Sequence, residues 1–200
     1  MTGRGFGTAA AVFAAGAAVG AAVPGLGGVC AAAAGGLAEA ARLLSRDGLL
    51  LFAFILAKNL TAVALALFAG EILKIPGYVW GRLAPRLGPR FARAAALPAR
   101  AGQLLGRLFP ALVLAVNGAV LAAVCASLSG LGVPPASLAA GILPHGVPEL
   151  SALFLACGAG MAGAATGEKF ALLCRAVLPL LAAAAALEVW VTPEVMRLAG

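Results

Sequence analysis

Five long apolar stretches, joined by shorter polar links, fill most of this 200-residue chain. Runs of about 18 or more apolar residues are typical of transmembrane helices. The alternating segments of roughly ten residues that build a membrane β-barrel do not occur in the sequence. The pattern therefore predicts an all-α, polytopic transmembrane helical bundle that forms a single domain. The expected spans cover residues 6–34, 49–73, 109–128, 137–163 and 170–191.

The composition favours the same class. Hydrophobic residues make up 63% of the chain and charged residues 10%, whereas a soluble domain has about 45–50% apolar and about 25% charged residues. The cysteines lie in or at the end of apolar stretches without a CxxC spacing, so we expect free thiols rather than a disulfide or a metal site. They are Cys30, Cys125, Cys157 and Cys174.

The first apolar stretch, residues 6–34, is rich in alanine and glycine. Small residues let helix backbones approach closely in a membrane, so this span suits tight helix packing and could serve a homo-oligomer. A cleaved secretory signal is the alternative interpretation, because Arg4 precedes the stretch and small residues abound. The length of the stretch favours a span that is retained.

The segment 74–108 differs from the rest because it carries seven cations and no acidic residue. Its arginines fall within about a 100° arc of a helix, which predicts a basic amphipathic segment lying on an anionic membrane surface. Prolines at positions 85, 89 and 98 predict two or three short helical pieces, and a plain basic loop is the alternative. The residues expected to contact lipid or a partner are Arg82, Arg86, Arg90, Arg93, Arg100 and Arg107.

The charge distribution predicts an orientation. With segment 74–108 in the cytoplasm, ten cations lie inside, whereas Arg42, Arg46 and Arg197 lie outside. The positive-inside rule therefore places the N-terminus in the cytoplasm and the C-terminus outside a cell membrane. The net charge of +7 is explained by anionic headgroups, and we expect no nucleic-acid partner.

Polar residues interrupt four of the spans. The sequence PHGVPEL, residues 144–150, holds the only histidine of the chain, and a carboxylate four residues later shares its helical face. Pro144 predicts that the helix is broken or begins there, with residues 137–143 as a re-entrant piece. Lys58 needs an interior partner, a water-filled cavity or a nearby interface. The expected intramembrane polar centre consists of Asn59, Asn117, His145, Glu149 and Glu188.

Three interpretations of this centre are open. It could be a polar latch that fixes helix packing, a proton or cation pathway that makes the chain a transporter or channel subunit, or a metal or catalytic site. Catalysis has little support, because the sequence lacks HExxH, a Ser–His pairing, a P-loop and a dinucleotide fingerprint. We therefore predict a non-enzymatic protein without a cofactor or a metal.

An ordered set of motifs carries a family resemblance. It comprises Lys58-Asn59 before an apolar stretch, Asn117-Gly118 within a span, PHGVPEL with a glycine-rich tail, and LEVWVTP at residues 187–193. From about residue 49 to residue 193 the chain resembles the stage II sporulation protein M family of integral membrane proteins. Segment 74–108 is longer than expected for that family.

The resemblance implies a multi-pass membrane protein that acts as a scaffold or as a subunit of a membrane complex. In spore-forming bacteria such a complex directs peptidoglycan hydrolases during engulfment. Many members of the family occur where no spores are made, so the name alone does not transfer the sporulation role. Other membrane proteins of a complex are the partners that the resemblance implies.

Overall fold

The computed structural model describes residues 3–23, 47–73, 75, 78 and 89–199, and it describes the backbone alone for residues 3–4, 89–103 and 199. Within these ranges every secondary-structure element is a helix. The long elements are α1 (Gly3–Ala22), α3 (Gly48–Ile72), α5 (Pro89–Gly130) and α6 (Pro135–Ala162). The last part of the chain comprises α7 (Thr166–Leu172), η1 (Leu173–Val177), α8 (Leu178–Ala186), η2 (Leu187–Val191) and α9 (Thr192–Ala199).

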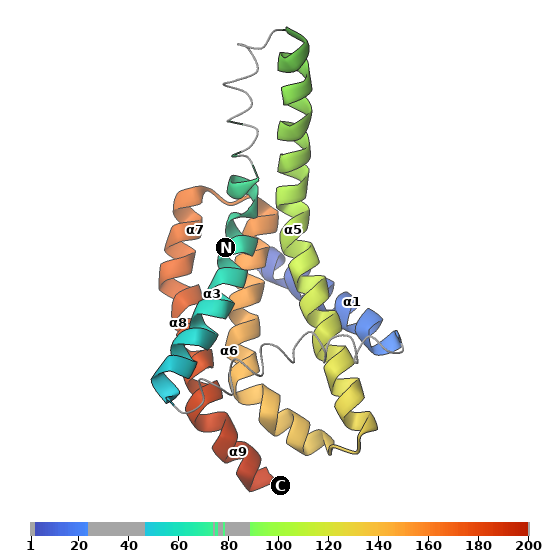
Figure 1. Ribbon diagram of the computed structural model, residues 1–200, viewed down its shortest axis with the longest axis vertical. Coiled ribbons are helices and arrows are strands. Elements are labelled where there is room, and N and C mark those ends of the chain that lie inside the picture. The colour runs from blue at the N-terminus through green and yellow to red at the C-terminus, as the bar shows by residue number, and fades with distance from the viewer. Residues whose placement is uncertain (1–2, 24–46, 74, 76–77, 79–88, 200) are drawn as a thin grey trace.

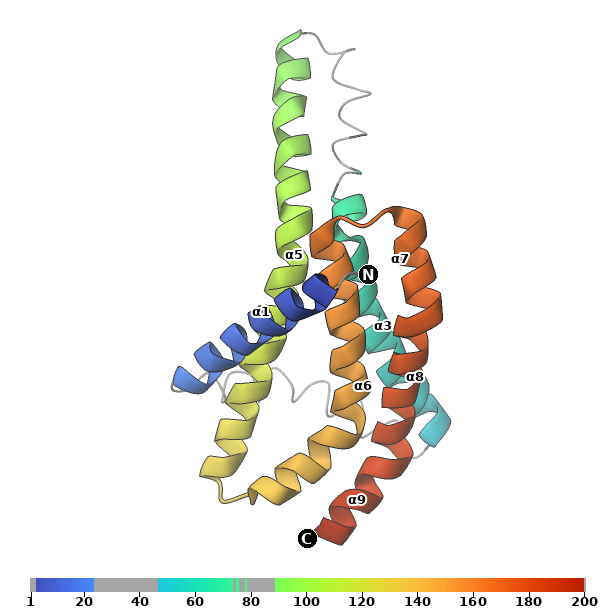
Figure 2. The same ribbon diagram turned by 180° about the vertical axis from the view of Figure 1, so that it is seen from behind.

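Five of the described helical stretches are long and apolar enough to cross a membrane. This confirms the predicted all-α bundle of about five spans. Figures 1 and 2 show α3, α6 and the α7–α8 rod running alongside one another, whereas α1 crosses α5 obliquely. The candidate spans are Gly5–Ala22, Gly48–Ile72, Leu104–Gly130, Pro135–Ala162 and Thr166–Leu198.

The core lies where α6 meets α3 and α8. Val63 and Leu67 from α3, Ala156 from α6 and Leu181 from α8 are all buried there. A Cβ atom added to Gly160 of α6 would lie 2.8 Å from the Ala66 carbonyl oxygen. The backbones of α6 and α3 are therefore nearly in contact, as small residues allow in membranes.

Glycines also permit the crossing of α1 and α5. A Cβ atom on Gly16 would collide with the Ala115 carbonyl oxygen, and one on Gly118 would collide with the Phe13 carbonyl oxygen. Neither glycine has a positive φ angle, so space rather than backbone conformation requires glycine here. The alanine- and glycine-rich first span packs as closely as its composition suggests.

α6 is bent rather than broken. The expected break at Pro144 is wrong, because one helix runs through Pro144 and Pro148 from Pro135 to Ala162. Each internal proline removes a backbone hydrogen bond and pushes the preceding turn aside, and Figure 1 shows that α6 changes direction in its first half. Residues 137–143 therefore belong to the same helix as the PHGVPEL sequence.

The basic segment also differs from the expectation. α5 continues without interruption from Pro89 through residue 98 to Gly130, so the predicted break at position 98 is wrong. Figure 1 shows the first part of this helix extending beyond the ends of α3 and α6. Residues 79–88, with Arg82 and Arg86, lie outside the described residues.

Candidate intramembrane polar site

α6 supplies two members of the polar site. His145 and Glu149 are one helical turn apart, and both side chains are partly buried. The imidazole Nδ1 atom of His145 lies 3.1 Å from the hydroxyl oxygen of Thr192, the first residue of α9. Thr192 is only 6% exposed. This hydrogen bond fixes the histidine ring and ties α6 to the end of the chain.

η2 supplies the third member, Glu188. A π-helical turn holds an extra residue and rotates the residues after it by about 100° relative to an α-helix. The segment is held by Trp190, whose ring stacks on Phe52 of α3 with centroids 5.6 Å apart. A Cβ atom on Gly48 would lie 3.2 Å from the indole nitrogen of Trp190, so glycine at position 48 leaves room for this ring.

The three side chains converge. One donor atom each from His145, Glu149 and Glu188 lies within 4.8 Å of the other two, and all three residues are partly buried. Lys58 of α3 attracts the Glu149 carboxylate, whereas Glu188 repels it. Asn59 is 6% exposed and lies on the buried face of α3. The structure thus brings together three of the five expected residues and buries a fourth inside the bundle.

Asn117 is placed elsewhere. It is exposed on α5, and its side-chain amide donates a hydrogen bond of 2.8 Å to the Val113 carbonyl oxygen of the same helix. It lines a hollow of about 370 Å³ between α3 and α5 whose other walls are apolar, including Ala62 and Leu65. The structure does not bring Asn117 to the cluster of His145 and the two glutamates.

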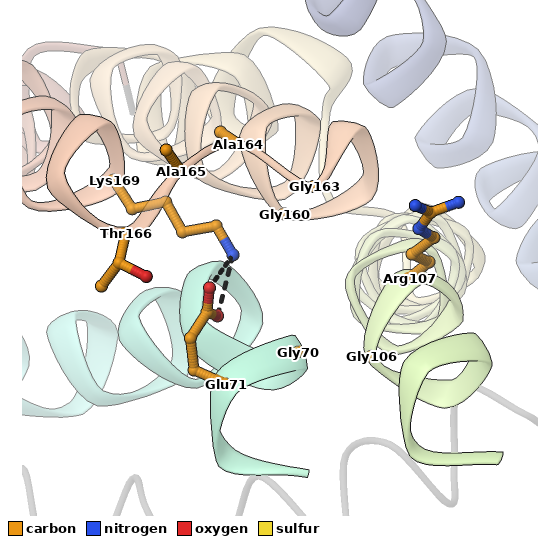
Figure 3. A pocket seen from close by; sticks show the side chains of 10 residues that line it. All are labelled: Gly70, Glu71, Gly106, Arg107, Gly160, Gly163, Ala164, Ala165, Thr166 and Lys169. Carbon is orange, nitrogen blue, oxygen red and sulfur yellow. Dashed lines mark hydrogen bonds and ion pairs between the residues drawn. The ribbon is translucent and has the colours of Figure 1, made fainter. Parts of the chain in front are cut away.

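A second polar site was missed by the sequence reasoning. The Lys169 ammonium donates hydrogen bonds to both carboxylate oxygens of Glu71, at 2.8 and 3.0 Å, and Figure 3 shows the two side chains meeting between α7 and α3. The Lys169 side chain is 3% exposed and that of Glu71 is 30% exposed. The Lys169 ammonium also lies 6.0 Å from the ring centroid of Phe68. This ion pair joins the end of the second span to the start of the fifth.

The ion pair lines a cavity of about 380 Å³. Gly163 ends α6 in the left-handed conformation, with φ 66°, and the chain then returns into α7. Arg107 of α5 stands on the other side of the cavity (Figure 3). Arg107 is exposed. The side chains of Arg90, Arg93 and Arg100 lie outside the described residues, so lipid contact at these positions stays a prediction.

The described cysteines are free thiols. Cys157 is buried in the core, Cys125 is partly buried and Cys174 is exposed. Cys30 lies outside the described residues.

Family comparison extends the resemblance carried by the motifs. A model of the stage II sporulation protein M family matches residues 8–193. The chain belongs to this family. No curated protein and no solved structure gave a significant match. In this stage II sporulation protein M family member the match begins in α1, upstream of the first motif recognised in the sequence.

In this family member, the two residues of the Glu71–Lys169 ion pair carried a signal in the sequence. Glu71 and Lys169 are opposite charges at span ends that the predicted topology places on the same side of the membrane, so their pairing was accessible from topology. Thr192 belongs to the terminal motif LEVWVTP, but its partner His145 is 47 residues away in the sequence. Only the folded chain identifies that contact.

Proposed function

We propose that this stage II sporulation protein M family member is a non-enzymatic subunit or scaffold of a membrane complex, with its N-terminus in the cytoplasm and its C-terminus outside a cell membrane. In a spore former, the complex would be one that directs cell-wall hydrolysis. The orientation follows from the excess of cations on one side of the predicted topology.

The observation that carries the proposal is the exposed Asn117. An amide on the outer face of a transmembrane helix is costly in lipid and promotes hydrogen bonding to another helix. The Asn117 amide nitrogen donates its hydrogen bond to the Val113 carbonyl oxygen, and no described residue donates a hydrogen bond to its side-chain oxygen, which can therefore accept one from a partner. The hollow beside Asn117, about 370 Å³ in volume, offers an apolar surface for a partner helix.

A cross-linking experiment tests this proposal in native membranes. A photoreactive residue at Leu112, which lines the hollow and is 58% exposed, should give a discrete protein adduct. The same group at Val147, which is 59% exposed on α6, serves as the matched position away from the hollow. Asn117→Leu should reduce the Leu112 adduct severalfold, whereas Ser127→Leu, at an exposed position of the same helix, should leave it unchanged.

Two results would contradict the proposal. One is a photoreactive residue at position 112 that cross-links only to lipid. The other is an adduct that persists undiminished in a folded Asn117→Leu protein. An adduct with a second copy of the chain would show that the partner is another copy and that the protein forms a homo-oligomer.

A transporter or channel subunit is the second candidate function. Its support is the convergence of His145, Glu149 and Glu188 inside the bundle, because clustered ionisable groups in membrane helices often mark proton or cation pathways. The test measures proton or cation flux in proteoliposomes. Glu149→Gln and His145→Ala should abolish flux while leaving the protein folded and partner cross-linking intact. Variants that simply unfold would remove the main support for transport.

A further inference from the structure

The cluster of His145, Glu149 and Glu188 has the geometry of an ion-binding site. Metal–ligand bonds of about 2.0–2.2 Å in a tetrahedral arrangement place neighbouring donor atoms about 3.4 Å apart. The donor atoms here lie within 4.8 Å of one another. Small side-chain rotations would therefore close the three groups around one ion, without a rearrangement of the helices.

Thr192 provides an independent observation, because it stands where a metal-binding histidine needs a partner. Histidine ligands bind with one ring nitrogen and usually donate the N–H of the other nitrogen to a nearby acceptor, which fixes the tautomer. The Thr192 hydroxyl oxygen lies 3.1 Å from Nδ1 of His145 and belongs to a residue that is 6% exposed. With the proton on Nδ1, the Nε2 atom is left with its lone pair for a ligand.

The two carboxylates of the cluster also favour binding of a cation. Among the described residues, neither Glu149 nor Glu188 has a hydrogen bond or an ion pair through its carboxylate. Lys58 of α3 attracts the Glu149 carboxylate, but its side chain is exposed and forms no ion pair within the described part of the chain. Two carboxylates in an apolar span are costly, and one divalent cation would balance both charges.

The donor set selects the kind of cation. Imidazole suits zinc, iron, nickel and copper, carboxylates suit manganese, and calcium and magnesium prefer oxygen ligands alone. One imidazole and two carboxylates form a mixed set, and three protein ligands leave a further coordination position open. We infer that His145, Glu149 and Glu188 together bind one first-row divalent transition-metal ion, of which Zn²⁺ and Mn²⁺ are the probes to use. This inference is independent of the complex-subunit role.

Metal content and thermal stability test the site together. The protein is purified in detergent with a tag that contains no histidine, stripped with a chelator, incubated with Zn²⁺ or Mn²⁺, desalted and analysed by mass spectrometry for bound metal. We expect about one ion per chain for at least one of the two metals. The same metal should raise the melting temperature, because a ligand that binds only the folded state stabilises it.

The variants separate ligands from neighbours. His145→Ala and Glu188→Gln should lose stoichiometric metal and the metal-dependent rise in melting temperature. Thr192→Val should bind about 10–100-fold more weakly, which is the usual effect of losing an outer partner of a histidine ligand. Glu194→Gln makes the same chemical change as Glu188→Gln at an exposed surface ion pair and should bind like the wild type.

Three outcomes would overturn the inference. The first is a folded, monodisperse wild-type protein that binds neither metal above one-tenth of an equivalent. The second is a folded Glu188→Gln protein that retains full metal content. The third is equal loss of metal in Glu194→Gln, which would show adventitious surface binding. If His145→Ala does not fold, Thr192→Val keeps the inference testable, because unchanged affinity in that variant contradicts the assigned histidine orientation.

Discussion

The Glu71–Lys169 ion pair predicts an asymmetric response to substitution. The Lys169 side chain is 3% exposed, whereas the Glu71 side chain is 30% exposed. Glu71→Gln would leave a buried ammonium without its counter-charge, which costs about 3–5 kcal/mol. Lys169→Met would leave a carboxylate that reaches water, and the loss should be about 1 kcal/mol, as for a surface pair.

The double variant measures how strongly the two charges are coupled. Glu71→Gln combined with Lys169→Met removes both charges, and the methionine side chain fills the space that the apolar part of the lysine side chain occupied. Because replacing a buried ion pair by apolar groups is often close to neutral, we expect the double variant to lose only about 1–2 kcal/mol. The coupling energy between the two positions should then be about 3 kcal/mol, at the upper end for residues in direct contact.

Equilibrium unfolding in mixed micelles measures these free energies, and thermal melting in detergent gives a parallel measurement. At about 2–4 °C per kcal/mol for a chain of this size, Glu71→Gln should lower the melting temperature by about 10 °C. Glu168→Gln is the control, because Glu168 is exposed and lies beside Lys169 in α7, and a glutamine side chain can still accept the hydrogen bond that the Ala165 N–H donates to Glu168. Equal losses in the two single variants, or effects that add within about 0.5 kcal/mol, would refute the assigned asymmetry.

Three further predictions concern helix packing and orientation. Gly118→Ala should destabilise the protein by about 1–3 kcal/mol in the same unfolding assay, because its Cβ atom meets the backbone of α1. Gly7→Ala should be neutral, because its Cβ atom meets no described residue within 4 Å. Trp190→Ala should weaken Zn²⁺ or Mn²⁺ binding by about tenfold, since the ring stacking that holds η2 is worth about 0.5–1.5 kcal/mol; unchanged affinity would show that η2 is held by other contacts. In a cysteine-free background, a membrane-impermeant maleimide should label Leu198→Cys in intact cells and Leu104→Cys only after lysis, and the reverse pattern would contradict the proposed orientation.

Local features of the sequence predicted the class of the protein and part of the candidate site. Long apolar runs require helices in lipid, because the bilayer cannot satisfy backbone hydrogen bonds. His145 and Glu149 share a face because they are four residues apart on one helix. The same local rules overestimated how strongly the prolines would interrupt the helices. Pro144 bends α6 without ending it, because a proline within a transmembrane helix can be accommodated by its neighbours.

Tertiary structure decided which polar residues meet. Helices that are apolar on all sides show no hydrophobic face that would fix their rotation in the bundle. The rotation of α5 is set by glycine contacts with α1, and it leaves Asn117 on the outer surface. The π-helical segment η1 precedes Glu188 in the last helix and shifts it out of simple α-helical register, so counting residues does not place Glu188. The sequence alone established a five-span membrane protein with costly polar groups, and only the packing of its helices gathered His145, Glu149 and Glu188 into one site.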